Sequence, residues 1–215
     1  MISIENLSHC YEDHWVLKGN HFKVSAGKTV GLLGPNGSGK TTLLKILATL
    51  LNPTQGKGQI GPFDLRSQVP QVRKNLHWLG HDSGLYAPLT ARENLEFFCR
   101  IQGIAPDSGH LNQALAEVGL SKFSSLQTAA FSAGMKKRLA MAKLLLKKVS
   151  LILLDEPHTN LDKSGRELMD SLIVRWKKEG VTLLLASHEE SIVRPLCDII
   201  MILEDGRILS QEGEK

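Results

Sequence analysis

A glycine-rich loop between an apolar strand and an amphipathic helix constrains the fold more than any other stretch. Residues 29–33 form an apolar run typical of a buried strand, and apolar residues recur at helical spacing from Leu43 to Leu50. The loop between them matches the pattern of Gly, four further residues and Gly-Lys-Thr. Its members are Gly34, Pro35, Asn36, Gly37, Ser38, Gly39, Lys40, Thr41 and Thr42.

A loop of this kind is suited to holding phosphate. Glycines let successive backbone N–H groups point at one anion, and the helix that starts here adds the positive end of its dipole. Lys40 would reach the terminal phosphates of a nucleotide, and the Thr41 hydroxyl would help to hold Mg²⁺. A glycine-rich turn without a ligand is the alternative, but strand, loop and helix agree in favouring the phosphate site.

Composition limits the classes of protein to which the chain can belong. The chain has 215 residues, 42% of them apolar and 22% charged, which suits one globular domain with a full core. A net charge of +4 is only mildly basic, so we expect no nucleic-acid partner. The cysteines, Cys10, Cys99 and Cys197, lie far apart and favour a reducing cytoplasm. We expect no signal peptide and no membrane span, so a membrane role would come through a partner.

The start of the chain is expected to form strands. Residues 1–28 show short apolar alternations that favour short strands, and residues 52–75 favour loops with weak strands. Tyr11 lies between the first two strands. An aromatic ring at that place would stack well on a flat base such as adenine, whereas composition alone favours a half-buried turn tyrosine.

The middle of the chain is expected to be helical. A short strand begins at Leu76, and Thr90 and Glu93 then form a capping box at a helix start. Helices are predicted at 94–101, 111–118 and 133–148, so that residues 86–145 form a helical insertion. The third helix carries basic residues that we interpret as a solvated face, with contact to acidic headgroups or a partner as the alternative: Lys136, Lys137, Arg138, Lys143, Lys147 and Lys148.

An α/β pattern then resumes, with strands at 151–154, 181–186 and 199–203, a helix at 168–176 and a hairpin turn at 205–206. Asp155 and Glu156 follow the first of these strands, where parallel sheets place their ligands. Asp155 fits an acceptor that holds Mg²⁺ through its waters, and Glu156 fits a base that polarises an attacking water. A pair of helix-capping acids is the alternative.

Two further features lie near predicted strand or helix ends. His188 follows a strand and could hydrogen-bond a γ-phosphate, although a lone histidine is more often a surface or packed residue. Ser132 and Gly134 precede the third helix, whose start would attract an anion. Because the chain already has one phosphate loop, a second such helix start suggests a site shared between two copies.

Taken in order, these motifs make the whole chain resemble the ATP-binding subunit of an ABC (ATP-binding cassette) transporter. The series runs from the phosphate loop through the Ser-x-Gly signature and Asp155-Glu156 to Asn160-Leu161-Asp162 and His188. The resemblance implies an α/β P-loop NTPase with a RecA-like core, an N-terminal antiparallel β region and an inserted helical subdomain. The core would comprise residues 1–85 and 146–215, and the subdomain about 86–145.

The same resemblance implies ATP hydrolysis with Mg²⁺ by two copies that close head to tail over two ATP. Lys40, Asp155 and His188 of one copy would then face Ser132 and Gly134 of the other. Tyr11 would stack on adenine. Asp162 would couple the two sites across the interface.

Two departures from the family pattern affect these expectations. Phe131, Ala133 and Met135 replace three of the five residues of the usual Leu-Ser-Gly-Gly-Gln signature. The added Cβ of Ala133 disfavours a left-handed backbone, so we expect ATP binding to survive and turnover to fall. His81 stands where the family has a glutamine that contacts Mg²⁺ and water, and turnover is expected to fall when His81 is protonated.

The stretches 79–85 and 89–95 are similar to the ATP-binding subunits of haem exporters in cytochrome c maturation. This implies a protein on the inner face of the cell membrane, peripheral and cytoplasmic, bound to an integral membrane subunit. His77 and His81 are not expected to bind haem. The alternatives are another ABC exporter subunit or a soluble ABC ATPase such as an iron–sulfur assembly factor; a DNA-repair ATPase would need a long coiled coil.

Overall fold

The computed structural model describes residues 1–213, which form two compact units. The first unit contains Met1–Gly80, Val149–Pro157 and the described chain from Leu172 onward. The second contains His81–Lys148 and His158–Ser171. The second unit is therefore inserted into the first at two places in the sequence.

A six-stranded sheet in the order β10-β9-β3-β8-β7-β6 forms the centre of the first unit. Its neighbouring strands are parallel except for the antiparallel pair β9–β10. The strands are β3 (Thr29–Leu33), β6 (Leu76–Leu79), β7 (Leu151–Asp155), β8 (Thr182–Ser187), β9 (Ile199–Glu204) and β10 (Arg207–Glu212). Every residue of β3, β7 and β8 is buried, because both faces of a parallel sheet are covered. The strands and the hairpin predicted in this part of the chain are confirmed.

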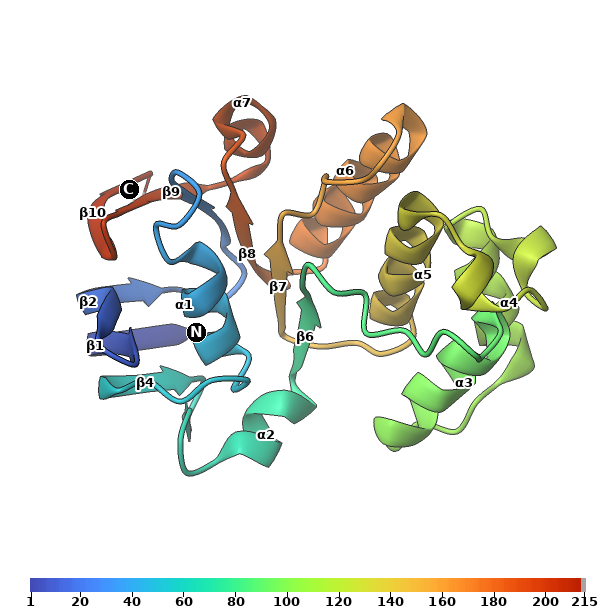
Figure 1. Cartoon of the computed structure of the whole chain (residues 1–215), viewed down its shortest axis with the longest axis horizontal. Coiled ribbons are helices and arrows are strands. Elements are labelled where there is room, and N and C mark those ends of the chain that lie inside the picture. The colour runs from blue at the N-terminus through green and yellow to red at the C-terminus, as the bar shows by residue number, and fades with distance from the viewer. Residues whose placement is uncertain (214–215) are drawn as a thin grey trace. The chain divides into compact units, whose positions relative to one another are not determined.

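A second, four-stranded antiparallel sheet belongs to the same unit, in the order β2-β1-β4-β5. Its strands are β1 (Ile2–Tyr11), β2 (His14–Val24), β4 (Gln55–Ile60) and β5 (Phe63–Asp64). Helix α1 (Lys40–Leu47) follows β3 and lies between this sheet and β8 in Figure 1. Its apolar side chains share one core with both sheets, which fixes the start of α1 against the end of β3.

The prediction of short strands over residues 1–28 is wrong in length. β1 and β2 have 10 and 11 residues and form one long hairpin. Their register shifts between Ile4 and Leu7, where Asn6 takes a φ of 51°. Such a bulge absorbs an extra residue without ending the strand, so the polar residue resembles a strand end in the sequence.

The prediction of loops and weak strands over residues 52–75 is only partly right. β4 and β5 lie there, but so does the helix α2 (Val69–Lys74). Pro70 occupies the first turn of α2. Proline suits that position because the first N–H groups of a helix have no partner within it, so the residue starts the helix rather than breaking it.

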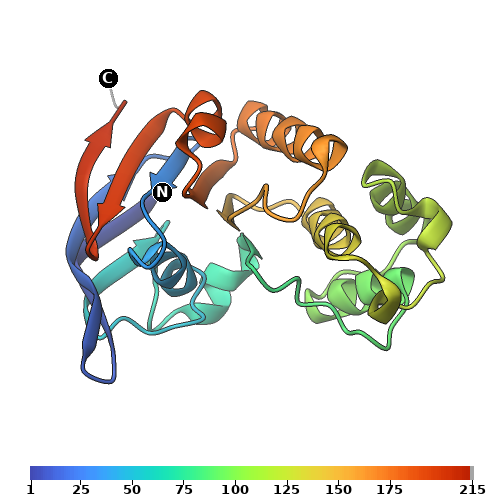
Figure 2. The same cartoon turned by 45° about the horizontal axis from the view of Figure 1, so that its top comes forward.

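Helices form the second unit (Figure 2): α3 (Ala91–Ile101), α4 (Ser108–Glu117), α5 (Ala133–Leu145) and the first half of α6 (Lys163–Lys178). The predicted capping box is confirmed, since the Thr90 side chain accepts from the Glu93 N–H and the Glu93 carboxylate accepts from the Thr90 N–H. The predicted helix at 133–148 ends earlier, at Leu145. The short helix α7 (Glu190–Val193) belongs to the first unit.

The prediction of a solvated basic face on α5 is wrong. Lys137 is buried, and the side chains of Arg138 and Lys143 are bound within the second unit. Because α5 packs against both α3 and α4, these long basic side chains extend over neighbouring protein surface, and their charged ends reach polar groups there. Of the six basic residues, Lys148 alone is exposed.

Among residues 1–213, none of the helices combines the length and apolar character that crossing a bilayer requires.

Asn20 joins the two sheets of the first unit. Its amide donates to the Gly206 carbonyl at 2.8 Å and accepts from the Ile208 N–H at 2.8 Å, while only 3% of the residue is exposed. β2, which carries Asn20, lies beside the β9–β10 hairpin in Figures 1 and 2. These bonds hold the hairpin against the antiparallel sheet.

We predict that Asn20→Ala lowers the free energy of unfolding of the first unit by roughly 2 kcal/mol, because a buried N–H and a carbonyl each lose a partner. The three tryptophans, Trp15, Trp78 and Trp176, all lie in this unit, so urea unfolding followed by their fluorescence reports it. The exposed Asn52→Ala serves as the control. A loss below about 0.5 kcal/mol for Asn20→Ala, the range of surface substitutions, would contradict this role.

Candidate functional site

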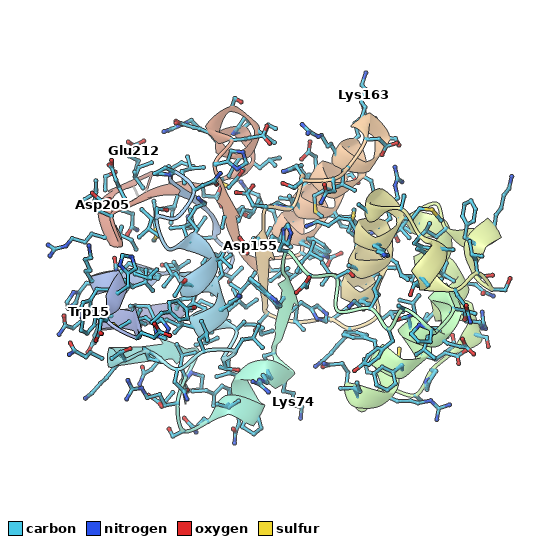
Figure 3. All side chains as sticks on the ribbon, in the orientation of Figure 1. Trp15, Lys74, Asp155, Lys163, Asp205 and Glu212 are labelled. Carbon is cyan, nitrogen blue, oxygen red and sulfur yellow. The ribbon has the colours of Figure 1, made fainter. Side chains whose placement is uncertain are left out.

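Three strands of the parallel sheet end side by side in the first unit. Leu33 at the end of β3 pairs with Ser187 on β8, and Asp155 at the end of β7 pairs with Ala186. The loop after β3, the residue after Asp155 and the residue after Ser187 therefore leave the sheet at one edge. Figure 3 shows Asp155 on β7 between β6 and β8. Ligands of open α/β sheets bind at this carboxyl edge.

The loop after β3 needs its glycines for space and for conformation. A Cβ on Gly34 would lie 2.0 Å from the Leu203 carbonyl oxygen, so no side chain fits there. Gly39 has a φ of 107°, and a Cβ would also meet the Val16 carbonyl oxygen at 3.0 Å. The absence of a side chain at these two positions lets the loop backbone turn tightly into α1, with its N–H groups available to an anion.

Lys40, the first residue of α1, lies over this loop. Its Nζ donates to the carbonyl oxygens of Gly34 at 2.7 Å and Pro35 at 2.9 Å. Burial lowers the pKa of the Lys40 ammonium, while the negative charges of Glu156 and Asp155 oppose that shift. The loop, the ammonium and the two carboxylates are thus electrostatically coupled in one place.

Ser38 supplies a second sign of a ligand site. Its Oγ is buried and has no hydrogen-bond partner among residues 1–213. A buried hydroxyl without a partner is costly, and a phosphate oxygen would satisfy it. Thr41 is exposed and Thr42 buried, so the Thr41 hydroxyl is the one open to solvent.

The acidic end of β7 is connected to the end of β8. Nδ1 of His188 donates to Oε1 of Glu156 at 2.9 Å, and the Ser187 hydroxyl donates to Oε2 at 3.3 Å. The Glu156 side chain is 22% exposed and that of His188 is 46% exposed. A carboxylate held by two donors yet open to water is well placed to accept a proton from it.

The backbone of Glu156 is unusual. Its φ is 46°, in the left-handed region that non-glycine residues seldom adopt, and its N–H donates to the Ala186 carbonyl at 2.9 Å. A conformation of this kind costs on the order of 1–3 kcal/mol and persists where its surroundings enforce it. It turns the Glu156 side chain toward the end of β8, where His188 binds it.

Tyr11 ends β1, in the β1–β2 hairpin that contacts the phosphate loop. The same hairpin carries Val16 and Leu17, which a Cβ on Gly39 would contact. Tyr11 is 44% exposed, and its ring packs edge to face on buried His9, with centroids 4.6 Å apart. The ring is therefore packed on His9 and still partly accessible to solvent, as stacking on a base requires.

The signature residues lie in the second unit, at the start of α5. Ser132 is the N-cap, its Oγ accepting from the Met135 N–H at 3.2 Å, and it is exposed. Ala133 is the first helical residue and has no positive φ. The expected backbone strain at Ala133 is therefore absent, and with it the reason to expect slower turnover. A Cβ on Gly134 would lie 3.2 Å from the Asn160 carbonyl oxygen.

Asp162 precedes α6 in the second unit and is bound to α5. Its Oδ1 accepts from Arg138 at 2.8 Å and from the Gly165 N–H at 3.0 Å, and Oδ2 accepts from the Ser164 hydroxyl at 3.0 Å. The bond from Arg138, followed by those from Ser164 and Gly165, lowers the pKa of Asp162 to about 2. Asp162 therefore remains charged at physiological pH, with 68% of its side chain exposed.

Comparison with known proteins identifies the family. A protein-family model described as ABC transporter matches residues 17–159, about two thirds of the chain. The chain belongs to the ABC transporter family. It is an ATP hydrolase, and its fold binds ATP. ABC ATPase subunits in general work with membrane subunits. The fold class predicted from the sequence is confirmed.

Curated relatives of this ABC protein differ in the roles that their names give. It is 37% identical to the cytochrome c biogenesis ATP-binding export protein CcmA of Haemophilus influenzae, over 88% of this chain and 89% of the relative. It is 33% identical to the ABC transporter ATP-binding protein NatA of Bacillus subtilis, over 86% of this chain and 77% of the relative.

Among solved structures, a dimeric ATP-binding cassette in a post-hydrolysis state bound to ADP and Pi superposes with a TM-score of 0.91. The two chains are 25% identical, and the match covers 100% of this chain and 99% of the other. Cassettes of this family thus form dimers in crystals.

Mg²⁺ fits the residues at the sheet edge. Among residues 1–213, no group of three or more His, Cys, Asp or Glu side chains could hold a metal ion alone. Mg²⁺ in nucleotide sites commonly takes one or two protein ligands and completes its shell with phosphates and water. Thr41 and Asp155, at the start of α1 and the end of β7, supply such a partial set.

The first unit brings together the phosphate loop, Asp155, Glu156 and His188. His81, Ser132, Gly134 and Asp162 belong to the second unit, and their share in the nucleotide site stays a prediction. Sequence reasoning assigned no role to Ser187, which binds Glu156, or to Arg138, which binds Asp162. Nothing in the sequence distinguishes Arg138 from its basic neighbours, whereas Ser187 stands at a strand end beside His188.

We predict that Lys40→Ala abolishes tight ATP binding, weakening it roughly 10- to 100-fold, since a charged hydrogen bond to phosphate is lost. Isothermal titration calorimetry with ATP measures the change. Lys45→Ala on the same helix, a half-buried lysine one turn later, should bind as the wild type does. Unchanged affinity for Lys40→Ala would argue against the phosphate site.

Proposed function

We propose that this ABC ATPase binds MgATP at the carboxyl edge of the first unit. The phosphates would lie in the loop 34–42, with Lys40 on the terminal phosphates and adenine on Tyr11. The observation that carries this proposal is the register that places the phosphate loop, Asp155 and the Glu156–His188 pair at one edge. The whole chain would act as one ATPase domain, with a core at 1–85 and 146–215 and a helical subdomain at about 86–145.

Hydrolysis in this proposal depends on Glu156 and His188. Glu156 accepts the proton of the water that attacks the γ-phosphate. Because Nδ1 of His188 donates to Glu156, the neutral ring presents Nε2 as an acceptor, and the protonated ring presents it as a donor to phosphate. The histidine thereby orients the base and contacts either the water or the phosphate.

Mg²⁺ would be held by the Thr41 hydroxyl and, through water, by Asp155, with His81 as a third contact. When bound, the metal ion neutralises the charge that develops on the phosphates. Lys40 shares this electrostatic task, and its coupling to both carboxylates shows that charges at this edge act on each other.

A second copy would complete the site. Ser132 and Gly134 at the start of α5 would contact the γ-phosphate held by the other copy, because an exposed helix start attracts an anion. Asp162 would couple the two sites, since its charge persists and its side chain is exposed. Dimeric cassettes among the structural neighbours support this arrangement.

For the transporter itself we propose haem export or another step of cytochrome c-type biogenesis. The support is the loop 79–85 together with CcmA relatives from four bacteria, Haemophilus influenzae among them, at 33–38% identity. The protein would then be peripheral on the inner face of the cell membrane, held there by an integral membrane subunit. NatA and other Bacillus subtilis ABC proteins at similar identity favour a different exporter as the second candidate.

Co-purification from membranes of the native host distinguishes the candidates. A haem exporter subunit should carry a multi-span membrane protein together with haem-handling proteins. A different membrane partner would favour the second candidate. A complex without any membrane protein, such as one with iron–sulfur assembly factors, would contradict a transport role.

We predict that Glu156→Gln keeps ATP binding but slows hydrolysis about 10²–10⁴-fold, the usual contribution of a general base. A glutamine still accepts the bond from His188 but takes up no proton. Steady-state phosphate release measures the rate, with the exposed Glu179→Gln as the charge-matched control. Near-normal turnover in Glu156→Gln would remove Glu156 from this role.

A further inference from the structure

The segment after His81 is bound to two helices of the second unit. It joins β6 to α3 without forming a strand or helix itself. Its backbone groups from Ser83 to Leu89 are held by side chains and by the backbone N–H groups of Thr128 and Ala129. One set of bonds comes from α5 and the other from α3 with Thr128. Both sets lie wholly within the second unit.

Lys143 of α5 makes the first set. Its Nζ donates to the carbonyl oxygens of Ser83 at 2.5 Å and Gly84 at 3.2 Å, and lies 6.0 Å from the centroid of the Phe98 ring. Burial lowers the pKa of Lys143 to about 8. An ammonium is costly to bury unless its N–H donors are hydrogen-bonded. The bonds to the two carbonyls therefore offset part of the cost of burying Lys143.

Asn94 of α3 makes the second set. Its Oδ1 accepts from the Tyr86 N–H at 2.8 Å, and its Nδ2 donates to the carbonyl oxygens of Tyr86 at 3.1 Å and Leu89 at 3.2 Å. The Thr128 hydroxyl donates to the same Tyr86 carbonyl at 3.0 Å. The segment from Ser83 to Leu89 is therefore fixed to the helices at both ends.

The geometry of α5 relates Lys143 to the signature. Eleven residues separate Ser132 from Lys143, which is about three helical turns, so both leave the helix on nearly the same side. A helix of this length moves as one body. A displacement of its signature end is then carried to the Ser83 and Gly84 carbonyls, and only His81 and Asp82 lie between these and the first unit.

We propose that Lys143 is a positioning residue for ATP hydrolysis, which ties the loop that carries His81 to the signature helix α5 and so sets the position of His81. This inference rests on the proposed function in one respect, the contact of His81 with the nucleotide site. It differs from a purely structural role, because its effect on turnover passes through His81.

The test compares variants of the full chain in ATP hydrolysis and in ATP binding by calorimetry. Lys143→Met removes both bonds and should lower kcat about tenfold, while Kd for ATP changes less than threefold. Lys143→Arg keeps donors and should stay within threefold of the wild-type kcat. Lys147→Met is the matched control, since Lys147 lies just beyond the end of α5 and donates to the Gln102 side chain instead of the loop.

A double-mutant cycle separates positioning from stability. If Lys143 acts through His81, Lys143→Met should lower kcat in the wild type but not further in His81→Ala. Equal additive losses in both backgrounds, or equal losses for Lys143→Met and Lys147→Met, would overturn the inference. So would a wild-type kcat for His81→Ala.

If Lys143→Met does not fold, Lys143→Gln replaces it, because the amide donates to one carbonyl and should give an intermediate kcat with the same non-additivity. The failure of the proposed function itself is seen separately, as normal hydrolysis by Glu156→Gln. That result leaves the comparison of Lys143 variants intact.

Discussion

The site of this ABC ATPase depends on one constraint, the register of three parallel strands. Because Leu33 pairs with Ser187 and Asp155 pairs with Ala186, the chain leaves β3, β7 and β8 at the same level of the sheet. Each exit carries one part of the chemistry: the phosphate loop, the carboxylates, and His188. A slip of one residue in either pairing would turn each side chain to the opposite face and separate these groups.

Local backbone conformation then orients the groups that the strand register brings together. Gly34 and Gly39 let the phosphate loop pass close to neighbouring backbone, and the left-handed Glu156 directs its carboxylate to His188. These positions depart from ordinary strand and helix geometry, and the core of both sheets around α1 holds them in place. The left-handed backbone of Glu156 lies where the proposed chemistry takes place, as is common at functional sites.

Much of the fold and of the site could be predicted from the sequence, because buried parallel strands are apolar runs and the phosphate loop has a fixed spacing. The bulge at Asn6 and the proline-initiated α2 were missed, since a polar residue and a proline resemble element ends. The surroundings of Lys143 were also missed. Whether a basic residue on α5 is solvated depends on α3 and α4, which pack on it from distant parts of the sequence.

The most direct measurement is a crystal structure of the wild-type protein with Mg²⁺ and a slowly hydrolysed ATP analogue at saturating concentration. We predict that the triphosphate lies against residues 34–42, with Lys40 turned from the Gly34 and Pro35 carbonyls toward the terminal phosphates and the base on Tyr11. A nucleotide bound elsewhere, or a loop without nucleotide under these conditions, would contradict the proposed site.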